Sequence, residues 1–385
     1  MYGKASFLAF VLAKWLPRYV FMRCRRRPSP VHIMFCMADH FEPGAGRATK
    51  DVEANRMATL LEKYPQLADS HFDTDGYRPR RTWFFPPHYH RHGNLKQLVS
   101  LCARGYGEVE LHLHHGKTRP DSAENLERTI TSCIADYARF GVFGTENGER
   151  RYGFIHGDWA LDNSRRSGRY CGVDNEIDVL KRTGCYADFT FPSCNEANPS
   201  QINSIYYARE DGRRRSHKRG APARVGVRND SDLLIVQGPL HPIRLNGSFF
   251  ALRAFGDDVA PGKPGSRRRV DHWVRTWIHV VGREEWIFVK VHTHGATDSA
   301  VVLGEEMDAT FRYLEDAYND GGDSLLHYVT ARELYNIVCA AECGETGNPG
   351  DYRDYRVARP VYDSSPAIME ACAELRELVA KTYVD

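Results

Sequence analysis

The sequence predicts an α/β protein whose parallel strands form a barrel-like sheet. Short apolar runs alternate with amphipathic helical stretches along most of the chain, as in proteins that place helices between parallel strands. Three of these runs end in acidic or histidine residues, and the active sites of α/β folds lie at the C-terminal ends of strands. With 385 residues, 42% of them hydrophobic, the chain is long enough for one large domain with appendages. We therefore expect a functional site where these strand ends meet.

The expected elements follow in order from residue 31. Apolar and β-branched residues predict strands at residues 31–37, 81–85, 109–115, 152–155, 187–191, 233–237 and 286–291. Spacing of apolar residues by three and four predicts helices at 51–64, 94–103, 121–140, 173–182, 307–318, 328–339 and 367–383. Ser122 is placed to cap the helix that begins near residue 121.

Composition divides the chain into three parts. Residues 1–30 form an apolar and basic N-terminal segment, residues 31–330 the main domain, and residues 331–385 a helical C-terminal extension. Two stretches of the main domain, residues 208–229 and 256–270, are rich in Arg, Gly, Pro and Ser and are predicted to be loop insertions.

Net charge and cysteine usage indicate which kinds of partner and which cellular compartment the sequence favours. A net charge of +2 does not indicate a nucleic-acid partner. The ten cysteines are scattered without metal-site or disulfide-framework spacing, which favours a reducing, cytoplasmic location. The N-terminal segment, with Lys14, Arg18 and the basic residues 23–27, is too short and too charged to span a membrane. It fits either a peripheral helix on the cytoplasmic face of the inner membrane or packing against the domain.

The most informative stretch is His-Leu-His-His at residues 112–115, at the end of a predicted strand. Alternation along the strand places His112 and His114 on one face. His112 and His115 have the H-x-x-H spacing at which two imidazoles reach one divalent ion, provided that the chain bends after the strand.

Two other strand ends carry similar groups. The run that begins at residue 31 leads into Asp39, His40 and Glu42. Much later, the run at 286–291 leads into His292 and His294, which period two places on one face. Together these ends predict a metal or acid-base site.

The order and spacing of these segments resemble the NodB-homology polysaccharide deacetylases. The resemblance covers about residues 31 to 300 and is carried by Asp39-His40, Thr82-Trp83-Phe84-Phe85, residues 105–115 and Val289-Lys290-Val291-His292. It implies a distorted (β/α) barrel of the polysaccharide-deacetylase type. It also implies a divalent metal, most simply zinc, and hydrolysis of an N-acyl group, most simply N-acetyl, from an amino sugar in surface polysaccharide biosynthesis.

The resemblance also implies roles for individual residues. Asp39 matches the family's general base, and His40 stands where the family has a metal-ligating aspartate. The ligands are then either His40, His112 and His115, or Asp39, His112 and His115, with Glu42 as a third, less favoured possibility. The family's late histidine, the general acid, corresponds to His292 or His294.

A substrate surface is expected just after the strand at 152–155. Residues 154–164 replace the family's Arg-Pro-Pro-Tyr segment and are dense in hydrogen-bonding side chains. Trp159 could stack on a sugar ring while His156, Asp158 and Asn163 bind its hydroxyls. The alternative is that Trp159 belongs to the core. A nucleotide-linked or lipid-linked sugar, rather than finished wall polymer, fits a cytoplasmic enzyme.

Two other classes of function remain open. Strand ends with H-x-H are also typical of amidohydrolase and phosphoesterase barrels, which use two metal ions. The altered motifs are also compatible with a catalytically degenerate protein that binds a membrane surface.

Overall fold

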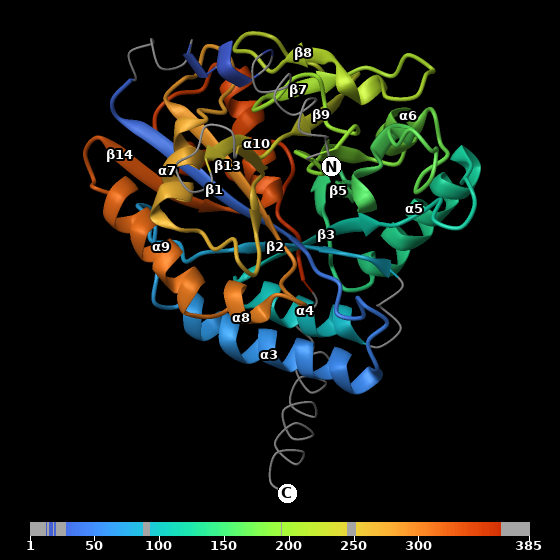
Figure 1. The fold of residues 1–385 in the computed structure, drawn as a ribbon, viewed down its shortest axis with the longest axis horizontal. Coiled ribbons are helices and arrows are strands. Elements are labelled where there is room, and N and C mark those ends of the chain that lie inside the picture. Colours follow the sequence, from blue (N-terminus) through green and yellow to red (C-terminus); the bar gives the residue numbers. More distant parts are fainter. Residues whose placement is uncertain are drawn as a thin grey trace, which may run out of the picture.

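A computed structural model describes residues 28–87, 93–193, 195–244 and 252–362, together with residues 13, 15–17 and 19–20. It contains a twelve-stranded, mostly parallel sheet flanked by helices (Figure 1), which confirms the α/β prediction. The strands run in the order β12-β13-β1-β2-β3-β5-β6-β9-β7-β8, with β14 beside β1 and β4 beside β5. Within the described part of the chain no pairing joins β12 to β8, so backbone hydrogen bonds do not close the sheet into a barrel.

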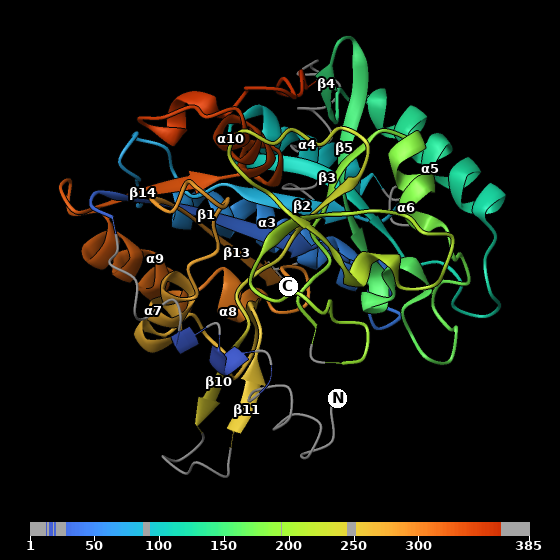
Figure 2. The same cartoon turned by 90° about the horizontal axis from the view of Figure 1, so that it is seen from above.

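The parallel strands carry most of the predicted site. They are β1 (Val31–His40), β2 (Arg81–Phe85), β3 (Gly107–Leu113), β5 (Glu149–His156), β6 (Cys185–Asp188), β9 (Leu233–Val236), β12 (Asp258–Val259), β13 (Trp286–Thr293) and β14 (Ser324–Val329). The antiparallel strands are β4 (Gly144–Glu146), β7 (Ile205–Ala208) and β8 (Gly220–Pro222). A separate hairpin, β10 (His241–Arg244) and β11 (Leu252–Phe255), projects from the body in Figure 2.

The helices agree well with the sequence periodicity. They are α3 (Lys50–Ala68), α4 (Asn94–Ala103), α5 (Ala123–Ala138), α6 (Glu176–Arg182), α7 (Arg267–Arg275), α8 (Ser299–Val302), α9 (Glu305–Tyr318) and α10 (Ala331–Glu342). Ser122 caps α5, as predicted, by accepting the backbone N–H of Asn125 at 3.2 Å. The helix expected at residues 367–383 lies outside the described residues.

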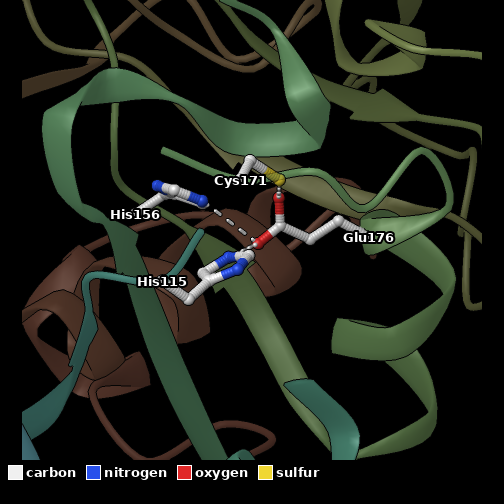
Figure 3. A group of neighbouring side chains, drawn as sticks. All are labelled: His115, His156, Cys171 and Glu176. Atoms are coloured by element: carbon white, nitrogen blue, oxygen red, sulfur yellow. Dashed lines mark hydrogen bonds and ion pairs between the residues drawn. The ribbon is translucent and has the colours of Figure 1, made fainter. Parts of the chain in front are cut away.

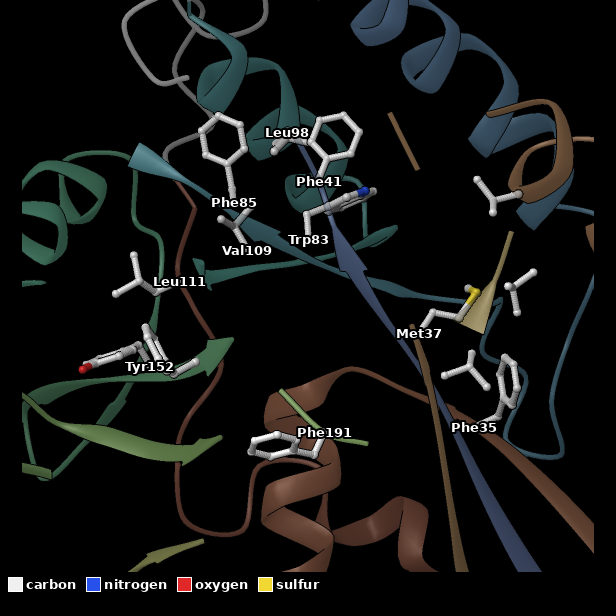
Figure 4. Close-up of a cluster of buried hydrophobic side chains, with 14 of the residues drawn as sticks. Phe35, Met37, Phe41, Trp83, Phe85, Leu98, Val109, Leu111, Tyr152 and Phe191 are labelled. Atoms are coloured by element: carbon white, nitrogen blue, oxygen red, sulfur yellow. The ribbon is translucent and has the colours of Figure 1, made fainter. Parts of the chain in front are cut away.

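Alternation along β1 divides the core into two layers. Phe35 and Met37 join the apolar cluster shared with Trp83 and with the outer helices (Figure 4). Met34 and Cys36 join a second cluster on the opposite face, which α10 covers. Burial of both faces explains why the strand reads as a continuous apolar run.

The C-terminal part and the insertions differ from the prediction in three respects. Residues 331–385 were expected to be an appended extension, but every residue of α10 is buried against the sheet. The helix expected at 328–339 begins only at Ala331, because residues 324–329 form the parallel strand β14. Residues 256–270 are also more than a loop, since they contain β12 and the start of α7.

The described residues near the N-terminus lie beside the β10–β11 hairpin. Trp15 stacks on Tyr19 at 4.5 Å between ring centroids, and Trp15 also contacts the ring of His241 at 4.8 Å. Lys14, Arg18 and residues 23–27, on which the predicted membrane contact depends, lie outside the described residues. No helix in the described ranges is both long and apolar enough to cross a bilayer.

Candidate active site

The ends of β1, β3 and β13 bring three imidazoles around His40. The ring centroid of His40 lies 5.1 Å from that of His112, 5.3 Å from His292 and 5.1 Å from His294. His114 continues the cluster at 4.7 Å from His112. The three strand ends therefore meet at one edge of the sheet, as the sequence predicts.

Within this cluster, Glu42, His112 and His114 form a set of donors that could hold a metal ion, here called the Glu42 group. One ligand atom from each residue lies within 4.8 Å of the others. His112 is fully buried, and its Nδ1 donates to the carbonyl oxygen of Ile155 at 2.9 Å. The Nε2 atom of His112 therefore carries a lone pair, and it has no hydrogen-bond partner. A buried, unpartnered nitrogen of this kind suits a metal ligand.

Burial and neighbouring charges shift the pKa values of both histidines in the Glu42 group. Burial, aided by the charge of His114, lowers the pKa of His112 to about 3, so this ring is neutral. His114 lies between Asp158 at 2.9 Å and Glu42 at 3.0 Å. Burial opposes its charge, but these two carboxylates prevail and raise the pKa of His114 to about 9. The side chains of Glu42 and His114 are 18% and 16% exposed, so solvent reaches this group.

The structure does not support the predicted pairing of His112 with His115. No set of three or more ligand atoms in the described residues contains both rings. His115 instead joins His156, Cys171 and Glu176 in a second set, here called the Cys171 group (Figure 3). The reason is the alternation of the strand: His112 and His114 share a face, and the chain does not bend enough to bring His115 to it.

Asp39 occupies a different position from the one predicted. Its side chain is fully buried, with one oxygen 3.1 Å from Nη1 of Arg81 and the other accepting the N–H of Gly295 at 2.6 Å. A Cβ on Gly295 would lie 2.2 Å from this carboxylate, so only glycine fits there. Asp39 thus fixes the turn after His294. This geometry favours a structural role for Asp39 over the predicted roles as base and ligand, because both oxygens already have partners and Asp39 belongs to no ligand set of the described residues. Those roles stay predictions. The other predicted ligand, His40, lies at the centre of the imidazole cluster but is not a member of the Glu42 group.

His292 is held by a carboxylate that the sequence did not reveal. Nδ1 of His292 lies 2.7 Å from Oδ1 of Asp257, and the other oxygen of Asp257 pairs with Nζ of Lys290 at 2.8 Å. Lys290 also donates to the carbonyl oxygens of Phe189 and Phe191. Burial opposes the charge of Asp257, but Lys290 and His292 lower its pKa to about 2. The arrangement leaves Nε2 of His292 as the nitrogen for proton transfer.

The expected substrate segment lies beside these groups, but only part of it faces them. The ring of Trp159 lies 6.4 Å from that of His292, and Asp158 bonds to His114. His156 is 1% exposed and Asn163 donates to Asp174 at 2.5 Å, so both are structural rather than substrate-facing. Trp159 is half-buried and packs partly against the core, which combines the two alternatives left open by the sequence.

The predicted insertion at residues 208–229 supports this segment from behind. The backbone N–H of His217 donates to Asp162 at 3.0 Å, and Arg214 donates to the carbonyl oxygen of Asn163 at 3.0 Å. The insertion is therefore part of the scaffold of the site.

Comparison with known proteins assigns the chain to no family. No protein-family model and no curated protein matches the chain. The resemblance to polysaccharide deacetylases therefore stays a prediction, and the function is argued from the site itself.

Proposed function

We propose that the protein is a metal-dependent hydrolase that removes an N-acyl group, most simply N-acetyl, from an amino sugar. The observation that carries this proposal is the Glu42 group beside the Asp257–His292 pair at the C-terminal edge of a parallel sheet. Two imidazoles and one carboxylate are the donor set of many catalytic zinc sites, which keep one position open. Partial exposure of Glu42 and His114 fits such an open position.

Glu42, His112 and His114 would hold the ion. A bound divalent ion lowers the pKa of water toward neutrality and polarises an acyl oxygen. Hydrogen bonds to Ile155 and Asp158 orient the two rings, as the outer partners of metal-ligating histidines commonly do. His112 is neutral, which is the form that binds metal, whereas His114 would release the proton between its Nε2 and Glu42 when the ion binds.

His292 and His294 are proposed to move the protons. Asp257 contacts Nδ1 of His292 and so orients the ring with Nε2 as the donor, which makes His292 the proposed general acid that protonates the departing amine. Burial and the charge of His292 lower the pKa of His294, which keeps His294 neutral and able to accept a proton from the attacking water. Asp39 positions the chain that carries His294.

The substrate class rests on the segment after β5. Trp159 offers an aromatic face next to His292, and Asp158 offers carboxylate oxygens beside His114. An aromatic face with directed polar groups is the usual way to bind a sugar ring. The open sheet order is compatible with a distorted barrel of the polysaccharide-deacetylase type, and the seven described cysteines, all free, fit the cytoplasmic location expected.

A screen of N-acetylated amino sugars tests the proposal. Purified protein with zinc is incubated with free, nucleotide-linked and lipid-linked N-acetylamino sugars, and both acetate and free amine are measured. We expect equal amounts of the two products, loss of activity with a chelator and recovery with zinc. A phosphomonoester or phosphodiester substrate that is cleaved while the amides stay intact would favour the phosphoesterase alternative instead.

A further inference from the structure

The Cys171 group joins four separate segments next to the candidate active site. His115 follows β3, His156 is the last residue of β5, Cys171 lies in the loop that leads to α6, and Glu176 is the first residue of α6 (Figure 3). One ligand atom from each residue lies within 4.8 Å of the other three. Bonds of about 2.0–2.3 Å to a central ion require only small adjustments from this spacing.

The two imidazoles of the group are oriented as metal ligands. His156 is 1% exposed, and its Nδ1 donates to the carbonyl oxygen of Gly157 at 2.6 Å. Its Nε2 is buried without a hydrogen-bond partner and lies 3.5 Å from Oε1 of Glu176. A lone pair aimed at a carboxylate oxygen is unfavourable unless a cation lies between the two atoms. His115 differs, because its Nε2 is hydrogen-bonded to the same Glu176 oxygen at 3.0 Å and its Nδ1 faces Asp121 at 3.2 Å. An ion bound here would replace the proton between His115 and Glu176.

Hydrogen bonds also hold the thiol of Cys171 and the carboxylate of Glu176 in place. The Sγ atom of Cys171 accepts the backbone N–H groups of Asn163 at 3.3 Å and Val173 at 3.5 Å, and its S–H donates to Oε2 of Glu176 at 3.2 Å. A zinc ion bound here would displace that thiol proton. Oε2 of Glu176 accepts the N–H of Asp162 at 2.6 Å, which leaves Oε1 for the ion. All four residues thus have outer partners that fix their direction.

The group is closed, in contrast to the Glu42 group. Cys171 and Glu176 are fully buried, and the side chain of His115 is only 8% exposed. Four protein donors leave no open position for water or substrate, which is the pattern of structural zinc sites. Imidazole with thiolate favours zinc over calcium or magnesium.

We propose that His115, His156, Cys171 and Glu176 bind a structural zinc ion that fixes the loop of residues 157–175. This loop carries Asp158 and Trp159 to the candidate active site. Its backbone has positive φ at five non-glycine residues, namely Asp158, Trp159, Asp162, Asn163 and Tyr170. Such conformations persist only where the surroundings enforce them, and a metal clamp at both ends of the loop does so. The proposal is independent of the reaction catalysed at the Glu42 group.

Cobalt substitution and metal counting test the site directly. Purified chain is stripped with a chelator and loaded with zinc or with cobalt. We expect two zinc ions per chain in the wild type and one in Cys171→Ser and in His115→Ala. Cobalt-loaded wild type should show a near-ultraviolet thiolate-to-cobalt charge-transfer band, and Cys171→Ser should lose it. Cys133→Ala, which removes a buried thiol of α5 outside either ligand group, is the matched control and should keep both ions and the band.

Limited proteolysis shows whether the ion holds the loop. Arg166 and Arg169 are exposed on it, and trypsin should cut there faster in the stripped chain and in His115→Ala than in zinc-loaded wild type. His115→Ala tests the site again if Cys171→Ser does not fold. The proposal is overturned if zinc content and the cobalt band are the same in wild type and Cys171→Ser, or if the wild type binds no zinc that depends on His115.

Discussion

Replacement of Asp257 by Asn should disable the enzyme without removing its metal. The carboxylate of Asp257 contacts the Nδ1 atom of His292 at 2.7 Å, and although burial opposes its charge, Lys290 and His292 lower its pKa to about 2, so it is charged near neutral pH. The neutral amide of asparagine no longer offers the carboxylate that pairs with His292 and orients its ring. Loss of a general acid costs about 10²–10⁴-fold in turnover, or about 3–5 kcal/mol in the activation barrier.

The same substitution also affects stability, and the assay must separate the two effects. Lys290 loses its charged partner but keeps the carbonyl oxygens of Phe189 and Phe191. Breaking a buried ion pair costs about 3–5 kcal/mol, and the asparagine oxygen should reduce that cost. Turnover is therefore measured well below the melting temperature, with zinc content determined in the same samples. Asp258→Asn is the matched control, because Asp258 pairs with Lys263 away from the histidines. Equal turnover in wild type and Asp257→Asn, or equal losses in both variants, would refute the assignment of His292.

Three further predictions concern stability and binding. His71 contacts Asp308 at 3.1 Å and Glu315 at 3.0 Å, and although burial opposes its charge, the carboxylates raise its pKa. His71→Gln should therefore destabilise the protein most below about pH 6.5. The difference in unfolding free energy should shrink as pH rises through the raised pKa. A difference that is constant with pH in urea titrations would contradict this. Arg332→Met removes the cation that pairs with the buried Glu108 and should lower the free energy of unfolding in urea by about 3–5 kcal/mol. The exposed pair of Arg359 is the comparison, and Arg359→Met should lower it by at most about 1 kcal/mol. Similar values for the two variants would be inconsistent with a strong Arg332–Glu108 ion pair. Trp159→Ala should raise KM by about tenfold, equivalent to about 1.4 kcal/mol, while Trp159→Phe retains most of the affinity; an unchanged KM in the alanine variant would place the ring outside the sugar site.

Local patterns predicted the fold and the edge where the site lies. Continuous apolar runs identified β1 and β13, alternation of apolar and polar residues identified β3, and helical spacing identified α4 at its observed bounds. These signals are local, because alternation and apolar stripes depend only on which face of an element is buried. Strand β14 was missed because its sequence reads equally well as the beginning of the following helix.

The ligand sets were harder to predict because they depend on contacts between distant segments. The H-x-x-H spacing suggested one ion between His112 and His115, whereas the alternation of the strand already separates these side chains. Following that alternation would have favoured His112 with His114, which is the observed pair. Asp257, Cys171 and Glu176 belong to no motif that points to metal binding or catalysis. Only the fold brings them to the histidines.

Zinc binding by the Glu42 group tests the central claim most directly. Zinc content is measured in wild type, in His112→Ala and His114→Ala, and in His71→Gln, which removes a histidine outside both ligand groups. Cys171→Ser serves as the common background, so that only the ion of the Glu42 group is counted. We expect one ion per chain in that background and with His71→Gln, and none with His112→Ala or His114→Ala. An undiminished ion in both of these variants would contradict the account.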